Sequence, residues 1–97
     1  MFGPVVTVQR FADDDQAIAW ANDVEYGLSA SVWTQSAKRG LRAVRKLQYG
    51  AVWLNDHFTI TNEMPHGGFK QSGYGKDMSK YGLDDYTIVK HVLAKFD

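Results

Sequence analysis

The sequence lacks cysteine and any long apolar run, and each absence excludes a class of function. The 97 residues hold 0 cysteines and only 2 prolines. Without thiols the chain forms no disulfide, binds no zinc through sulfur and carries no thiol nucleophile. Neither a signal peptide nor an apolar run of membrane length is recognisable, so we expect a cytosolic protein with no membrane partner.

An excess of charge of either sign is also missing. The sequence has 11 basic and 11 acidic residues, which gives a formal net charge of zero. No basic patch suited to nucleic acid stands out, and we expect no nucleic-acid partner. The one basic cluster falls on a predicted helix, where a solvated face is favoured over an anion site because no aromatic residues interleave with it. A net charge near zero favours self-association.

Apolar runs alternate with amphipathic stretches over residues 1–54. Strands are predicted over residues 5–10, 28–34 and 51–54, and helices over 14–25 and 37–48. This alternation predicts an α/β fold in which three parallel strands are joined by two crossover helices. The predicted core residues are Val6, Val8, Ile18, Ala21, Val32, Leu41, Val44, Leu47 and Val52.

A run of three aspartates, Asp13 to Asp15, precedes the first predicted helix. Carboxylates at this place cap a helix and complement its positive end, and we favour that interpretation over a metal cluster. The histidines indicate no metal site either, because His57 and His66 lie nine residues apart, which matches no common ligand spacing. Ser72 lacks the sequence context of a hydrolase nucleophile.

A long glycine-rich loop follows the third predicted strand, over residues 55–80. It contains Gly67, Gly68, Gly73 and Gly75 together with many apolar and aromatic side chains. Loops of this length inside compact domains are usually functional. A binding loop is favoured, and a merely packed Ω-loop is the alternative. The loop leaves the carboxyl end of a predicted parallel strand, where ligands of such sheets collect.

The end of the sequence predicts a short helix over residues 78–85 and a last strand over residues 86–96. This strand has no evident partner within the predicted sheet. It would therefore be an edge strand, and the unpaired backbone groups of an edge template pairing with another chain.

The loop carries a family resemblance. Residues 64–77 read M-P-H-G-G-F-K-Q-S-G-Y-G-K-D, and Phe2 to Pro4 read F-G-P. The first stretch resembles the P-x-G-G-x-K-x-S-G-x-G-[KR]-[ED] signature near the C-terminus of NAD(P)-dependent aldehyde dehydrogenases, and the second resembles part of their E-x-F-G-P motif. The form of residues 63–68 looks most like the aminobutyraldehyde and betaine-aldehyde branch.

The resemblance implies a reaction that this chain lacks the groups to perform alone. In that family a cysteine thiolate attacks the aldehyde, hydride passes to NAD(P)+ and a glutamate activates water. The cysteine and the Rossmann half would belong to a missing N-terminal part. NAD or NADP would bind the parent enzyme, and we expect none on this chain alone. Residues 1–54 would form a βαβαβ part of the catalytic domain, residues 55–80 the active-site loop and residues 81–97 an oligomerisation segment.

Five positions carry functional expectations from the resemblance. Phe2 matches an aromatic residue beside the nicotinamide, and Phe58, Ile60 and His66 fall where the family lines its substrate tunnel. Asp77 stands where many members have a glutamate thought to relay protons. For Phe2, Phe58 and Ile60 taken alone, plain packing is the favoured alternative.

Two functions therefore compete. The first is the C-terminal part of an aldehyde dehydrogenase acting on an aminoaldehyde, which is not competent alone. The second is a stand-alone, non-catalytic folding or oligomerisation module derived from that family. Under either one, we expect self-association through residues 87–96.

Overall fold

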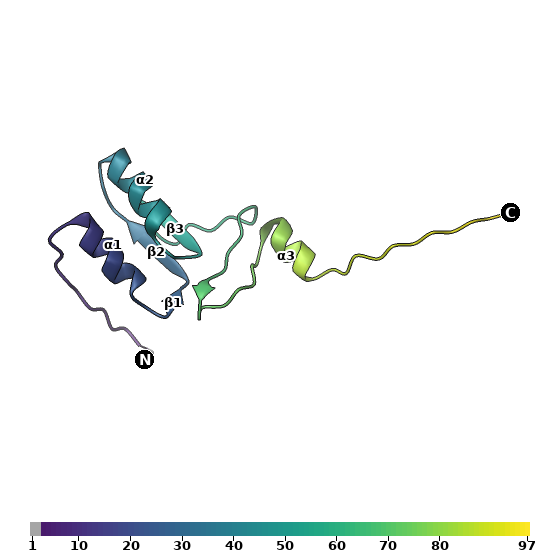
Figure 1. Cartoon of the computed structure of the whole chain (residues 1–97), viewed down its shortest axis with the longest axis horizontal. Helices are drawn as coiled ribbons and strands as arrows, with labels where there is room; N and C mark the ends of the chain where they lie inside the picture. Colours follow the sequence, from purple (N-terminus) through teal and green to yellow (C-terminus); the bar gives the residue numbers. More distant parts are fainter. Residues whose placement is uncertain (1–2) are drawn as a thin grey trace.

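The computed structural model describes residues 3–97, and its helices and strands lie between residues 14 and 85 (Figure 1). Phe2 lies outside the described residues, so its predicted cofactor contact stays a prediction. The elements in chain order are α1 (Asp14–Asn22), β1 (Tyr26–Gly27), β2 (Ser29–Val32), α2 (Ala37–Lys46), β3 (Ala51–Leu54), β4 (Phe69–Lys70) and α3 (Ser79–Asp85).

One βαβ unit forms as the sequence predicts. Strands β2 and β3 pair in parallel, with Ser29 opposite Ala51 and Val32 opposite Leu54. Helix α2 connects them and packs against both strands, and α1 packs against α2. Leu54 points toward this helix, because a Cβ added at Gly40 of α2 would lie 2.7 Å from the Leu54 Cδ1 atom. The α/β class and the parallel pairing of these two strands are confirmed.

Short polar side chains cap the first residues of α1 and α2. The carboxylate of Asp13 accepts a hydrogen bond from the Gln16 amide at 2.8 Å, and the Ser36 hydroxyl accepts one from the Arg39 amide at 3.4 Å. These bonds satisfy amides that have no partner within a helix. The predicted capping role is therefore confirmed for Asp13, and both helices end a few residues earlier than predicted.

The acidic start of α1 also meets the basic face of α2. Arg39 is paired with Asp14, while Arg42 and Lys46 lie 2.5 and 3.2 Å from the carboxylate of Asp15. The hydrogen bond from Arg39 lowers the pKa of Asp14, and those from Arg42 and Lys46 lower the pKa of Asp15. The basic cluster is thus partly used to hold the two helices together.

The predicted first strand is wrong. No strand forms over residues 5–10, and Val6 and Val8 are 85% and 88% exposed. A β-branched run of this kind needs neighbouring strands to pair with and layers to cover both faces. Within residues 3–97 the only parallel ladder joins β2 to β3, so the three-strand sheet does not form.

The predicted last strand does not form either. Residues 87–97 have no regular structure, and Figure 1 shows them running away from the rest of the molecule to the C-terminus. A strand exists only where a second strand receives its backbone hydrogen bonds. The expectation that a second copy supplies that strand stays a prediction. The predicted short helix is present as α3.

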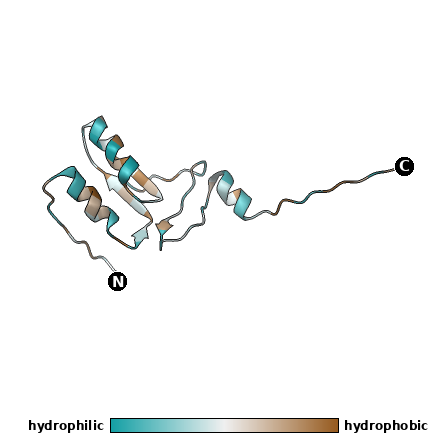
Figure 2. Ribbon diagram, viewed as in Figure 1, coloured by the Kyte–Doolittle hydropathy of each residue, from teal (hydrophilic) through white to brown (hydrophobic). Residues whose placement is uncertain are grey.

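No apolar side chain within residues 3–97 is buried. Six predicted core residues are half-buried, while Val6, Val8 and Leu41 are exposed and were wrongly assigned to the core. The four buried residues are all glycines: Gly27, Gly40, Gly68 and Gly82. Apolar residues also lie along the open tail (Figure 2). The accessible surface is 8692 Å², about one and a half times the roughly 5,600 Å² expected for a compact protein of this mass.

Candidate functional site

The glycine-rich segment from His66 to Asp77, here called the signature loop, is closed at its neck. The His66 amide donates to the carbonyl oxygen of Asp77 at 2.9 Å, and the Asp77 amide donates to that of His66 at 2.8 Å. This reciprocal pair brings together two residues that the sequence analysis selected for different reasons. The two ends of the signature loop therefore lie together, as the ends of an Ω-loop do. The choice between a binding loop and a packed Ω-loop for the whole of residues 55–80 stays a prediction.

The tip of the signature loop is attached to the segment between α1 and β2. Strand β4 pairs antiparallel with β1, a short ladder that the sequence analysis missed. Beside it, the Gln71 amide donates to the Glu25 carbonyl at 2.9 Å. The Gly27 amide donates to the Ser72 hydroxyl at 3.0 Å. The loop is thus held at both its neck and its tip.

The base of the signature loop lies directly against the start of β3. A Cβ added at Gly50 would lie 2.7 Å from the carbonyl carbon of Gly67 and 3.0 Å from the Gly68 Cα atom. The Gly50 amide donates to the Gly27 carbonyl at 3.0 Å. Two backbones approach here more closely than any side chain allows, which explains why the position holds glycine.

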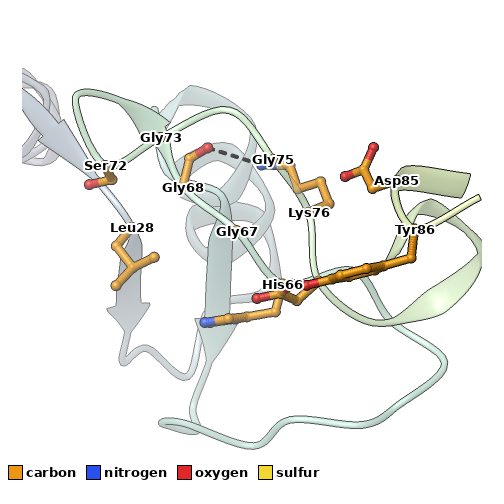
Figure 3. A pocket seen from close by; sticks show the side chains of 11 residues that line it. Leu28, His66, Gly67, Gly68, Ser72, Gly73, Gly75, Lys76, Asp85 and Tyr86 are labelled. Atoms are coloured by element: carbon orange, nitrogen blue, oxygen red, sulfur yellow. Dashed lines mark hydrogen bonds between the residues drawn. The ribbon is translucent and has the colours of Figure 1, made fainter. Parts of the chain in front are cut away.

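Lys76 crosses the inside of the signature loop. Its ammonium donates to the Gly68 carbonyl at 3.0 Å, drawn as a dashed line in Figure 3, and lies 5.2 Å from the centre of the Phe69 ring. A cation at this distance from an aromatic ring is attracted to it. Lys76 therefore braces the loop from within.

A cavity of about 460 Å³ opens between the signature loop and the end of α3. Glycine backbone forms much of its wall, and the polar side chains that line it include His66, Ser72, Lys76, Asp77 and Asp85. Figure 3 shows the Tyr86 ring extending from the end of α3 toward His66. Imidazole, ammonium and carboxylate groups together suit a polar ligand.

A second cluster lies on the other side of the β2–β3 sheet. Alternate residues of a strand face opposite sides, so Trp53 lies on the side away from Leu54 and α2. The Trp53 indole donates to the Thr59 carbonyl at 2.8 Å. Its ring centre lies 5.7 Å from that of His57 and 6.3 Å from that of Phe58. The start of the long loop is thereby folded over this face of the sheet.

The aromatic cluster contains a hydroxyl–imidazole contact but no catalytic triad. The Ser31 hydroxyl and the His57 Nδ1 atom lie 2.7 Å apart. The Asp56 carboxylate accepts instead from the Thr59 hydroxyl and from the backbone amide of His57, and these bonds lower the pKa of Asp56. A carboxylate engaged in this way does not orient the His57 ring, so the contact does not resemble an activated serine.

The predicted site residues fall into two places. His66 and Asp77 line the same cavity. Phe58 and Ile60 do not line it and lie in the loop beside Trp53, where they are 65% and 36% exposed. Phe58 also has a φ of 63°, a left-handed conformation that is rare for an aromatic residue and marks a constrained position. Their assignment to a substrate tunnel stays a prediction.

Two kinds of function find no support in the part of the chain that the structure describes. Residues 3–97 contain no group of three or more potential ligands placed to hold a metal ion. Likewise, none of the helices formed by these residues is long and apolar enough to cross a membrane.

Comparison with known proteins identifies the relationship. The sequence pattern of the aldehyde dehydrogenase family matches residues 1–92. The chain belongs to the aldehyde dehydrogenase family. It is 44% identical over 92 residues to the betaine aldehyde dehydrogenase of Bacillus subtilis, covering 95% of this chain and 19% of that protein. It is 42% identical over 97 residues to the NADP/NAD-dependent aldehyde dehydrogenase PuuC of Escherichia coli, covering 100% of this chain and 20% of that protein.

Solved structures of aldehyde dehydrogenases share the fold. The betaine aldehyde dehydrogenase of Staphylococcus aureus in complex with NAD+ matches with a TM-score of 0.89 at 42% identity, over 93% of this chain and 18% of that one. The NAD+ complex of an aldehyde dehydrogenase from Bacillus cereus matches with a TM-score of 0.88 at 47% identity, over 92% of this chain and 18% of that one. The chain spans about a fifth of the length of these family members.

Sequence reasoning missed the groups that attach the signature loop. Lys70 and Ser72 belong to the family signature, but nothing in their spacing indicates that they bond to the end of α1 and the segment after it. Glu25 and Gly27, which bond to the signature loop, lie more than 40 positions earlier in the sequence, at and just after the end of the first predicted helix. A hydrogen bond between segments so far apart leaves no periodic signal in a single sequence.

Proposed function

We propose that this chain supplies the C-terminal part of an NAD(P)-dependent aldehyde dehydrogenase and works only with the part that carries the catalytic cysteine. The observation that carries this proposal is the absence of any buried apolar side chain within residues 3–97. A chain with 44% apolar residues that buries none of them gains little from the hydrophobic effect by itself. A further polypeptide that covers this surface would supply the missing burial.

The apolar surface available to such a partner is extensive. It includes side chains that are at least 60% exposed in the N-terminal segment, just after β2, in the long loop and in the tail. Examples are Val8, Trp33, Phe58 and Leu93. Large exposed apolar surfaces on a soluble protein usually bind a partner. The share of about a fifth of each relative's length supports the same proposal.

The substrate that we propose is an aminoaldehyde. His66 lines the polar cavity, and the family relatives include proteins named betaine aldehyde dehydrogenases. A residue that is both polar and aromatic suits a polar or cationic substrate group better than an apolar ring does. The cofactor would be NAD or NADP, bound by the catalytic part with Phe2 beside the nicotinamide.

The other site residues receive roles that follow from their surroundings. Phe58 and Ile60 would line the aldehyde access tunnel once the catalytic part covers the aromatic cluster. Asp77 would take part in proton relay. Its backbone is fixed by both bonds to His66, and the residue is one of those that line the polar cavity. Residues 87–96 would pair with another copy of the chain, because these residues leave an extended apolar segment without a strand to pair with.

A second candidate function has one observation in its favour. The sequence has 0 cysteines, so no thiolate is available for aldehyde attack. A stand-alone folding or oligomerisation module would need none. This alternative makes a different prediction about partners: the chain would associate with itself and would not bind the catalytic part of a relative.

Complementation distinguishes the two functions. The Bacillus subtilis betaine aldehyde dehydrogenase would be produced without the segment that matches residues 1–92, and the full chain would be added in trans. Co-elution of the two polypeptides, with NADH formation from betaine aldehyde, is the result we expect. An intact relative without the added chain is the positive control. Failure of the two polypeptides to co-elute at any ratio would favour the stand-alone module.

A further inference from the structure

The cation that complements the partially negative carboxyl end of α1 comes from outside the helix. The last turn of α1 contains no basic residue. The carbonyl groups at a helix C-terminus have no partner within the helix and carry partial negative charge. Lys70, on the signature loop, places its ammonium 2.6 Å from the Asn22 carbonyl oxygen and 3.0 Å from the Val24 carbonyl oxygen. A residue 48 positions later in the sequence therefore caps this helix.

The same helix end is bonded to the end of α2. The Asn22 side chain donates to the Lys46 carbonyl at 2.9 Å and accepts from the Gln48 amide at 2.9 Å. The Tyr49 hydroxyl donates to the Ala21 carbonyl at 2.5 Å. Residues 21–24 are thus a joint at which α1, the end of α2 and the signature loop meet.

Lys70 reaches this joint at a conformational cost. Its φ is 53°, a left-handed conformation that is uncommon for residues with a side chain. Such a conformation persists where surrounding interactions hold it. The antiparallel pair with Tyr26 on one side and the two carbonyl contacts on the other supply those interactions.

We propose that Lys70 is a positioning residue: its ammonium clamps the signature loop to the carboxyl end of α1 and thereby sets where His66 and Asp77 lie. The two hydrogen bonds of Lys70 support a role in positioning the signature loop. The ammonium donates to two carbonyl oxygens within one short segment, so the bonds fix the direction of the Lys70 side chain as well as its distance from α1. The importance of the clamp for aldehyde oxidation rests on the proposed function, whereas the clamp itself does not.

Amide hydrogen exchange on the full chain tests the clamp directly. The variants are Lys70→Met, which keeps an unbranched side chain without donors, and Lys70→Arg, which keeps charge and donors. Lys38→Met, on the exposed face of α2, is the matched control. We expect exchange of the Gln71 amide to become roughly tenfold faster in Lys70→Met, since hydrogen bonds to charged groups contribute on this scale.

The two other variants separate a clamp from general destabilisation. We expect Lys70→Arg to keep Gln71 exchange within about threefold of the parent and Lys38→Met to leave it unchanged. Equal exchange in Lys70→Met and Lys38→Met would overturn the proposal. So would exchange in Lys70→Arg as fast as in Lys70→Met, because charge and donors would then not matter.

A measurement on the parent chain covers the case in which Lys70→Met fails to fold. Amine acetylation followed by mass spectrometry compares the reactivity of Lys70 with that of Lys38 in the same sample. We expect slower labelling of Lys70, because its ammonium is held by two carbonyl oxygens. Equal labelling rates would overturn the clamp even without a folded variant. None of these readouts requires complementation, so failure of the proposed function would leave the test intact.

Discussion

Replacing Gly50 with alanine would test how the signature loop is seated on the sheet. The added Cβ would lie 2.7 Å from the Gly67 carbonyl carbon and closer still to its oxygen, whereas ordinary contact begins at 3.4 Å. The loop must therefore move by at least 0.7 Å, and the neighbour that has to move is backbone. Overpacking of this kind typically costs about 1–3 kcal/mol. Movement of this size would also disturb the bond between the Gly50 amide and Gly27.

Gly75→Ala is the matched control, because the structure has no atom within 4 Å of a Cβ at that glycine of the same loop. The assay is urea unfolding of the full chain, monitored by tryptophan fluorescence. The buffer contains an osmolyte that favours compact states. We expect Gly50→Ala to lower the free energy of unfolding by about 1–3 kcal/mol and Gly75→Ala to change it by less than about 0.5 kcal/mol. If Gly50→Ala unfolds at the same urea concentration as Gly75→Ala, the loop does not rest on Gly50 in solution.

Three further predictions concern the helices, the tail and the chemistry. Hydrogen bonds and ion pairs with Arg39, Arg42 and Lys46 lower the folded-state pKa of Asp14 and Asp15, so their contribution to stability is full at neutral pH and is lost as pH falls below the ordinary value of 3.8. The thermal stability of an Asp14→Asn/Asp15→Asn variant should depend less on acid pH than that of the parent, and an unchanged pH dependence would contradict this. Val89→Pro should weaken self-association measured by light scattering, because proline removes a donor and bends a strand, whereas Val89→Ala should not; equal association of both variants would exclude pairing through the tail. The purified chain alone should form no NAD(P)H from aldehydes, and turnover that survives removal of contaminating enzymes would refute the requirement for a thiol from the catalytic part.

The parts of the fold that the sequence predicts are those held by local patterns. The second strand, the second helix and the third strand lie close together in the chain, and alternation of apolar and amphipathic segments predicts their βαβ arrangement. The start of the first helix was predicted from the aspartates that include Asp13, since a cap bonds to an amide only a few positions away. Asp13 was found with this bond.

The elements that sequence analysis predicted wrongly or missed depend on contacts that local patterns do not describe. Val6 and Val8 carry a strand pattern, yet a strand needs a partner, and residues 3–97 supply none. Apolar periodicity describes what a segment must bury and leaves open which polypeptide covers it. The β1–β4 ladder was missed for the opposite reason: Tyr26 and Lys70 form a pair without any pattern around them. At the candidate site, the signature motif predicts His66 and Asp77, but their mutual bonds depend on loop closure that no motif describes.

The absence of buried apolar side chains has a consequence for the life of the molecule in a cell. Chaperones and proteases recognise exposed apolar segments, and here a tail with Ile88, Val89, Val92 and Leu93 is exposed to them. Under the function proposed above, copies of the chain without the catalytic part would be the copies most readily degraded. The abundance of the chain would then follow the supply of that partner.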